Sequence, residues 1–295
     1  MELKTPIRIY WDVTPLPAAP PPWERACADL LALRVLQVTL RDNGPELAPV
    51  TWAILERFQG APLALVLEAT APARSAAVRG RLAEMGVRLL LVPVDAPAEV
   101  ATLTLVGPLP VGVSWEATGE NWRELPALLA ACVDHGIAIV SLPMPRLVGA
   151  ATAFSLSAAE QVELAGLLAA TLEIDRLRLT VHDPFLWRLV YPQTPFPEGG
   201  CQAANTMLYL APDGTVYPCP ALPEPLGSLA TTSLAELLAT PAKGELRRLL
   251  QTPPAVCASC PEAATCLGGC RGRGLVTAGS LAAADPGCGR LPEVF

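Results

Sequence analysis

Short apolar runs alternate with segments of helical periodicity through the first 190 residues. The runs carry several apolar or β-branched residues, and Gly or Pro flanks most of them, which is typical of buried strands. They lie at residues 7–14, 34–40, 62–69, 87–94, 110–117, 137–144 and 176–183, with helical patterns at 51–59, 75–86, 121–136 and 157–173 between them. Since strands that alternate with helices form parallel sheets with right-handed crossovers, the sequence predicts an α/β fold. Six or seven units are too few for a closed eight-stranded barrel. A partial (β/α)6-type barrel is the first interpretation, and an open doubly wound sheet is the second.

Local signals mark where several elements begin or end. Ser157 followed by Glu160 fits a capping box, and so does Ser233 followed by Glu236, while Gly136 is placed to end the helix at 121–136. The segment 191–200 is rich in Pro and Gly and reads as a linker. It divides the chain into a barrel part at 1–190 and a C-terminal domain at 201–295. In the latter, 205–219 predicts a hairpin and 232–251 a helix.

Composition and charge exclude some classes of protein. The chain is 52% hydrophobic, but no run of eighteen uncharged apolar residues predicts a membrane span. The net charge is −7 with no basic tract, so we expect no nucleic-acid partner. The first residues lack the basic start and apolar stretch of a signal peptide, and we expect a cytoplasmic protein.

Cysteine is the residue type that indicates chemistry. Cys27 and Cys132 stand alone in the first 200 residues, and we interpret both as ordinary buried or helical cysteines. The other seven are Cys201, Cys219, Cys257, Cys260, Cys266, Cys270 and Cys288. An odd number cannot pair fully, and clustered thiols in a reducing compartment more often bind metal. Thiolates suit iron–sulfur clusters, with zinc as the alternative.

The spacing of the seven cysteines resembles the SPASM domain, the C-terminal extension of many radical SAM peptide-modifying enzymes. The segments DGTVYPC, LGSL and CLGGCRG agree with that pattern. The resemblance implies two auxiliary [4Fe–4S] clusters. Carried over by position, the family's scheme assigns the distal cluster to Cys257, Cys260, Cys266 and Cys288, and the proximal cluster to Cys201, Cys219 and Cys270.

The proximal set lacks a fourth cysteine. Many relatives have one a few residues before the first of the set, but LVYPQTPFPEGG contains none. The resemblance therefore implies either an open iron or a non-cysteine ligand. His182, Asp183 and Glu198 are the candidates for that ligand.

The barrel part lacks the hallmark of radical SAM enzymes, a CxxxCxxC loop after the first strand. Only Cys27 occurs there, and one thiolate cannot hold a cluster that binds S-adenosylmethionine. We therefore expect a degenerate barrel that neither binds S-adenosylmethionine nor has radical SAM activity of its own.

The chain also resembles the GeoRSP system SPASM domain proteins, a family that accompanies a complete radical SAM/SPASM enzyme. This implies a cluster-bearing partner of that enzyme and of its precursor peptide, in the maturation of ribosomally made peptides. Two alternatives stay open: an enzyme that uses an open auxiliary-cluster iron as a Lewis acid, and a structural zinc protein.

Overall fold

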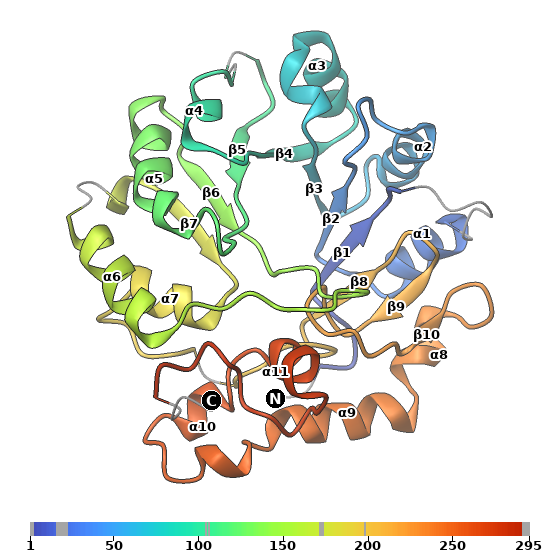
Figure 1. The fold of residues 1–295 in the computed structure, drawn as a ribbon. Helices are drawn as coiled ribbons and strands as arrows, with labels where there is room; N and C mark the ends of the chain where they lie inside the picture. The colour runs from blue at the N-terminus through green and yellow to red at the C-terminus, as the bar shows by residue number, and fades with distance from the viewer. Residues whose placement is uncertain are drawn as a thin grey trace.

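The computed structural model describes residues 3–15, 23–103, 105, 107–170, 174–197 and 199–290, and Figure 1 shows their arrangement. The strands are β1 (Arg8–Asp12), β2 (Gln37–Arg41), β3 (Ala64–Glu68), β4 (Val87–Pro93), β5 (Val111–Ser114), β6 (Ile139–Leu142), β7 (Arg178–Val181), β8 (Met207–Leu210), β9 (Thr215–Tyr217) and β10 (Gly227–Ser228). The helices are α1 (Trp23–Ala32), α2 (Pro49–Phe58), α3 (Ala76–Glu84), α4 (Pro97–Val100), α5 (Leu125–Asp134), α6 (Ala158–Ala169), α7 (Pro184–Val190), α8 (Leu234–Leu238), α9 (Pro241–Gln251), α10 (Ala263–Cys266) and α11 (Arg271–Ala278). Short 3₁₀ turns lie at Ala71–Arg74, Trp122–Glu124, Ile174–Arg176 and Ala255–Cys257.

One curved sheet organises the molecule. Strands β1 to β7 pair in parallel in chain order, and the sheet continues past β1 through β8, β9 and β10. The order ends at β7 on one side and at β10 on the other, so the barrel does not close. Figure 1 shows the strands as an arc, with helices outside it and the C-terminal segments below the gap. The predicted α/β partial barrel is thereby confirmed.

The two faces of the barrel strands differ in chemistry. On β1, Ile9 and Trp11 are buried in the main hydrophobic core. Arg8 and Tyr10 alternate with them and line a cavity of about 370 Å³ inside the arc. This period of two places apolar side chains against the helices and polar ones in the lumen.

The segment between β6 and α6, residues 143–156, crosses the barrel toward the N-terminal strands (Figure 1); we call it the strap. Its Leu147 is buried, and the Leu147 amide donates to the Pro220 carbonyl at 3.1 Å. Its Arg146 donates to both carboxylate oxygens of Asp12, at 2.8 and 2.9 Å. The strap therefore connects three regions that are distant in sequence.

The C-terminal segment extends the same sheet. The predicted hairpin is confirmed as β8 and β9, which pair antiparallel. Strand β8 also pairs in parallel with β1, so this segment completes the N-terminal side of the barrel. Whether 191–200 is a boundary between independent domains stays a prediction.

The predicted single helix at 232–251 is wrong. It divides into α8 and α9, because Thr240 caps a new helix through a hydrogen bond from the Lys243 amide and Pro241 occupies its first turn. The predicted capping boxes at Ser157 and Ser233 are confirmed. No helix of the described residues has the length and apolar character needed to cross a bilayer.

Candidate metal centres

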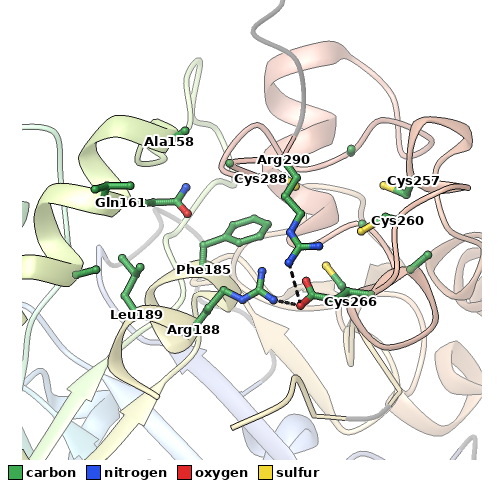
Figure 2. A pocket seen from close by; sticks show the side chains of 17 residues that line it. Ala158, Gln161, Phe185, Arg188, Leu189, Cys257, Cys260, Cys266, Cys288 and Arg290 are labelled. Atoms are coloured by element: carbon green, nitrogen blue, oxygen red, sulfur yellow. Dashed lines mark hydrogen bonds and ion pairs between the residues drawn. The ribbon is translucent and has the colours of Figure 1, made fainter. Parts of the chain in front are cut away.

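The four cysteines of the distal set line one cavity of about 320 Å³ between the C-terminal segment and helices α6 and α7. In Figure 2, Cys257, Cys260, Cys266 and Cys288 lie on one side of this cavity, opposite Gln161, Phe185 and Leu189. Cys257 ends a 3₁₀ turn, and its carbonyl accepts from the Cys260 amide at 2.9 Å, which fixes the tight CxxC turn. Cys266 ends α10, while the Cys288 amide donates to the Asp285 carbonyl at 3.0 Å.

An ion-paired carboxylate lies at the edge of the distal cavity. Glu262 pairs with Arg188 of α7, and Arg290 lies 3.5 Å from the same carboxylate oxygen. Arg188 also lies over the Phe196 ring, 4.7 Å from its centroid. The dashed lines in Figure 2 mark the two pairs. Through them the barrel helix α7 and the chain after Cys288 are attached to the turn that carries the cysteines.

The backbone between Cys266 and Cys270 has a conformation that favours glycine. Leu267, Gly268 and Gly269 have φ values of +50°, +92° and +73°. A Cβ on Gly268 would lie 2.6 Å from Cδ of Pro254, and one on Gly269 would lie 2.7 Å from Cβ of Asp285. Both the φ angle and the space therefore require Gly at these two positions.

The three cysteines of the proximal set line a second cavity, also of about 320 Å³. It lies between the end of β7, the segment before β8, and the start of α11. Cys219 follows β9 and is buried, and Cys270 is the residue that precedes α11. Gly272 lets α11 approach the chain after Cys219, because a Cβ there would lie 1.6 Å from the Ala221 carbonyl oxygen.

The thiol electrostatics divide the cysteines in the same way. Burial raises the pKa of Cys219, and the nearby Cys201 and Cys270 raise it further. Burial likewise raises the pKa of Cys257, with Cys288 and Cys260 adding to the effect. The pKa of Cys266 is raised by burial, while hydrogen bonds from the Gly268 and Gly269 amides lower it. In each case the thiols that act on one another belong to the same proposed set.

These features fit iron–sulfur ligation. A thiol must lose its proton to bind metal, so buried thiols such as Cys270, whose pKa burial raises to about 12, couple metal binding to proton release. Amides directed at a ligating sulfur tune such clusters, and the Gly268 and Gly269 amides are placed to do this if Cys266 is a ligand. Among the described residues, no group of three or more His, Cys, Asp or Glu side chains converges closely enough to hold a single metal ion.

A buried ion triad connects the two sets with the barrel. Arg273 of α11 pairs with Asp183, the residue that caps α7, and with Asp285, and Arg273 and Asp285 have 3% and 0% of their side chains exposed. Asp285 also accepts from the Cys270 amide at 2.6 Å. Its own amide donates to the Gly268 carbonyl at 3.0 Å. Sequence reasoning missed Asp285, since nothing in ADPGC predicts an ion pair.

The buried arginines beside the cysteines are structural. Arg271 donates to the carbonyls of Thr252, Leu267 and Leu281. Arg273 directs its donors to the two carboxylates. Both side chains hold loops in place around the cysteines.

The candidates for a fourth proximal ligand have different surroundings. Asp183 and His182 line the proximal cavity, and Glu198 lies outside the described residues. One Asp183 oxygen accepts from the Phe185 and Leu186 amides, and the other pairs with Arg273. His182 has its Nε2 3.3 Å from the Tyr10 hydroxyl. Burial and the nearby Arg8 and Arg146 lower the His182 pKa to about 4, so the imidazole is neutral.

The carboxyl end of β1 contains no thiol. Asp12 is buried there, bonded to Arg146 and to the Tyr209 hydroxyl at 3.2 Å. Cys27 is fully buried in the core on α1, where burial raises its pKa to about 12. Cys132 is fully buried on α5, and burial again raises the pKa to about 12.

Residues 201–261 match the SPASM family, an iron–sulfur cluster-binding domain. The match includes Cys201, Cys219, Cys257 and Cys260. The chain therefore carries a SPASM domain attached to an open α/β barrel.

Solved structures share this architecture. SuiB from Streptococcus suis, crystallised with its precursor peptide SuiA, superimposes with a TM-score of 0.71 at 15% identity, covering 98% of this chain and 77% of SuiB. The enzyme anSMEcpe with bound AdoMet gives a TM-score of 0.67 at 14% identity, covering 96% of this chain and 94% of that one. The fold is thus that of the radical SAM/SPASM enzymes.

A curated relative is similar in sequence. The PqqA peptide cyclase of Ruegeria pomeroyi is 31% identical over 183 residues, or 59% of this chain. The chain spans about half the length of this relative, with 48% of it covered.

Proposed function

We propose that this protein holds two [4Fe–4S] clusters and acts in the cytoplasm as the partner of a radical SAM/SPASM enzyme that modifies a precursor peptide. The distal cluster is assigned to Cys257, Cys260, Cys266 and Cys288, and the proximal one to Cys201, Cys219 and Cys270. When bound, such clusters would supply electron transfer and a charged surface for binding the peptide or the partner enzyme. The protein residues position the cysteines, shield them from water and orient the amides around them.

The observation that carries the proposal is the division of seven thiols between two cavities. Four line the distal cavity, and the other three line the proximal cavity, which Cys266 also borders. Cys266 and Cys270 are close in sequence but belong to different sets, and this crossed order is the one that the SPASM resemblance implies. The SuiB structure contains a precursor peptide, and the cyclase is named for its peptide PqqA; both support a peptide as the molecule that the partner enzyme modifies.

The closed end of β1 supports a role without cleavage of S-adenosylmethionine. Asp12, Arg146 and Tyr209 satisfy one another there. The chain after β1 has Cys27 as its sole thiol before β2, and that thiol is packed in the core. The segment between β1 and β2 therefore lacks the three thiolates that hold an S-adenosylmethionine-binding cluster in radical SAM enzymes.

Anaerobic isolation tests the proposal. We expect about eight irons and about eight acid-labile sulfides per chain, with the visible absorption of cubane clusters. The reduced protein alone should form no 5′-deoxyadenosine from S-adenosylmethionine, whereas a complete partner enzyme should. Stoichiometric zinc without sulfide would establish the structural zinc alternative. Deoxyadenosine formed by the chain alone would overturn the partner role.

The three-thiol proximal set favours one second candidate, an enzyme that uses an open iron as a Lewis acid on a peptide. That candidate predicts a change in the peptide when the chain acts without its partner enzyme. Mass spectrometry of the peptide after incubation with the chain alone distinguishes the two. An unchanged mass favours the partner role.

A further inference from the structure

We propose that the imidazole of His182 is the fourth ligand of the proximal cluster. The inference rests on the proposed function and deepens it, because it completes the set of Cys201, Cys219 and Cys270. A histidine at this position would give the two clusters different electronic properties.

His182 lies in the same part of the molecule as the three proximal cysteines. His182 directly follows β7 and lines the same 320 Å³ cavity as the three proximal cysteines. Its backbone amide donates to the Leu142 carbonyl at 3.1 Å, which fixes where the side chain leaves the strand. His182 also lines the lumen cavity, so it lies where the barrel interior meets the proximal thiols.

Asp183, the other candidate that lines this cavity, already has hydrogen-bond partners for both carboxylate oxygens. Both Asp183 oxygens are used, one by two amides at the start of α7 and the other by Arg273. Moving Asp183 to a metal would remove the cap of α7 and leave a buried arginine with one carboxylate fewer. His182 has no such structural duty at both ends of its side chain.

One ring nitrogen of His182 lies near a hydroxyl oxygen, which leaves the other nitrogen for a metal. Nε2 lies 3.3 Å from the Tyr10 hydroxyl, and the two rings meet edge to face with centroids 5.9 Å apart. A ligating histidine normally donates its other N–H to an oxygen, which fixes the tautomer and the ring orientation. When Nε2–H donates to Tyr10, Nδ1 retains the lone pair that binds metal.

This assignment has an electronic consequence. A neutral imidazole replaces a negative thiolate, and histidine ligation raises the potential of iron–sulfur centres. We therefore expect the proximal cluster to be reduced at a higher potential than the four-thiolate distal cluster.

The test exploits the histidine content of the chain, which is two. Protein labelled with ¹⁵N-histidine is compared with unlabelled protein, both loaded with clusters and reduced, by pulsed electron paramagnetic resonance. We expect one strongly coupled nitrogen whose coupling changes with the isotope. The measurement needs no substitution, so it holds even where a variant fails to fold.

Variants then identify the residue. The exposed His135, which directly follows α5, serves as the matched control. The nitrogen coupling should be lost in H182A and kept in H135A, while H182C should keep the proximal cluster at a lower potential. Two clusters without histidine coupling would overturn the ligand and leave the proposed function standing. A protein with zinc and no sulfide would overturn both.

Discussion

The carboxyl end of β1 and the C-terminal cysteine region organise their polar groups in opposite ways. At the end of β1, the buried Asp12 is matched by Arg146 from the strap and by Tyr209 from β8. In the cysteine region, seven thiols line two cavities, and several have pKa values raised by burial. The first region is complete as it stands, whereas the thiols of the second would gain their bonding partners from the proposed clusters.

The difference indicates that the barrel and the cysteine region are stabilised by different interactions. The barrel keeps its architecture without a thiol at the end of β1, because apolar side chains pack its core and Arg146 pairs with Asp12 there. The cysteine region has small apolar elements, such as the four-residue α10, so the proposed function predicts that it depends more on metal for its stability. The following predictions test this contrast.

Substituting neighbouring cysteines should have the largest and most distinctive effect. Cys266→Ala should remove the distal cluster and Cys270→Ala the proximal one, each lowering the iron content from about eight to about four per chain. Iron counting with electron paramagnetic resonance distinguishes which signal is lost. Cys132→Ala, a buried cysteine outside both cavities, should retain both clusters. Loss of the same signal in both variants would contradict the crossed assignment.

Removing Arg273 should be the next largest effect. Arg273→Met leaves Asp183 and Asp285 buried without their cation, and we expect a loss of about 3–5 kcal/mol in the free energy of unfolding. Denaturant unfolding of the loaded protein measures this. The control is Arg248→Met, which breaks an exposed pair with Glu245 and should leave unfolding unchanged. Equal stability of both variants would show that the triad does not join the cysteine region to the barrel.

The pair at the end of β1 should cost less when broken. Arg146→Met leaves Asp12 with the Tyr209 hydroxyl as its remaining side-chain partner, and we expect a loss of about 3 kcal/mol. The double variant Asp12→Asn with Arg146→Met should recover part of it, since no carboxylate is left unpaired. Iron content should be unaffected. Parallel loss of iron would mean that the two regions are not energetically separate.

Glu116 should produce the smallest effect, visible in its pH dependence. Burial raises the pKa of Glu116, outweighing the nearby Arg146 and Arg41. The folded state then holds this proton to a higher pH than the unfolded state, so stability falls as pH rises above the unfolded pKa of about 4.3. Glu116→Gln should gain stability relative to the parent as the pH rises above about 4.3. The exposed Glu120→Gln is the control, and equal pH profiles for both variants would contradict the prediction.

The barrel strands and helices could be predicted from the sequence, because each is marked by a pattern of residues close together in the chain. Alternating apolar runs located all seven barrel strands, and capping boxes at Ser157 and Ser233 marked helix starts. The helix at 232–251 was wrong because its apolar period continues across Thr240 and Pro241, whose capping geometry depends on the backbone. Whether the seven cysteines are ligands stays a prediction, although their arrangement in two cavities agrees with it.

The interactions that the sequence could not predict are long-range. Arg146 and Asp12 are 134 residues apart, and Arg273 and Asp183 are 90 apart. No local pattern records such a pairing, because it depends on how the strap and α11 are placed by the completed fold. The His182 contact with Tyr10, across 172 residues, is of the same kind.

The pairing of β8 with β1 also sets a timetable for synthesis of the chain. Met207 is opposite Arg8, so one edge of β1 has no strand beside it until about 200 more residues have been made. At about 5–20 residues per second, that interval is about 10–40 s on the ribosome. Cys201 and Cys219 flank β8 and β9, so these two proximal thiols come together when this edge is covered, before Cys270 has been made. Completion of the sheet therefore falls late in translation, and the proposed proximal set is complete only once Cys270 has followed.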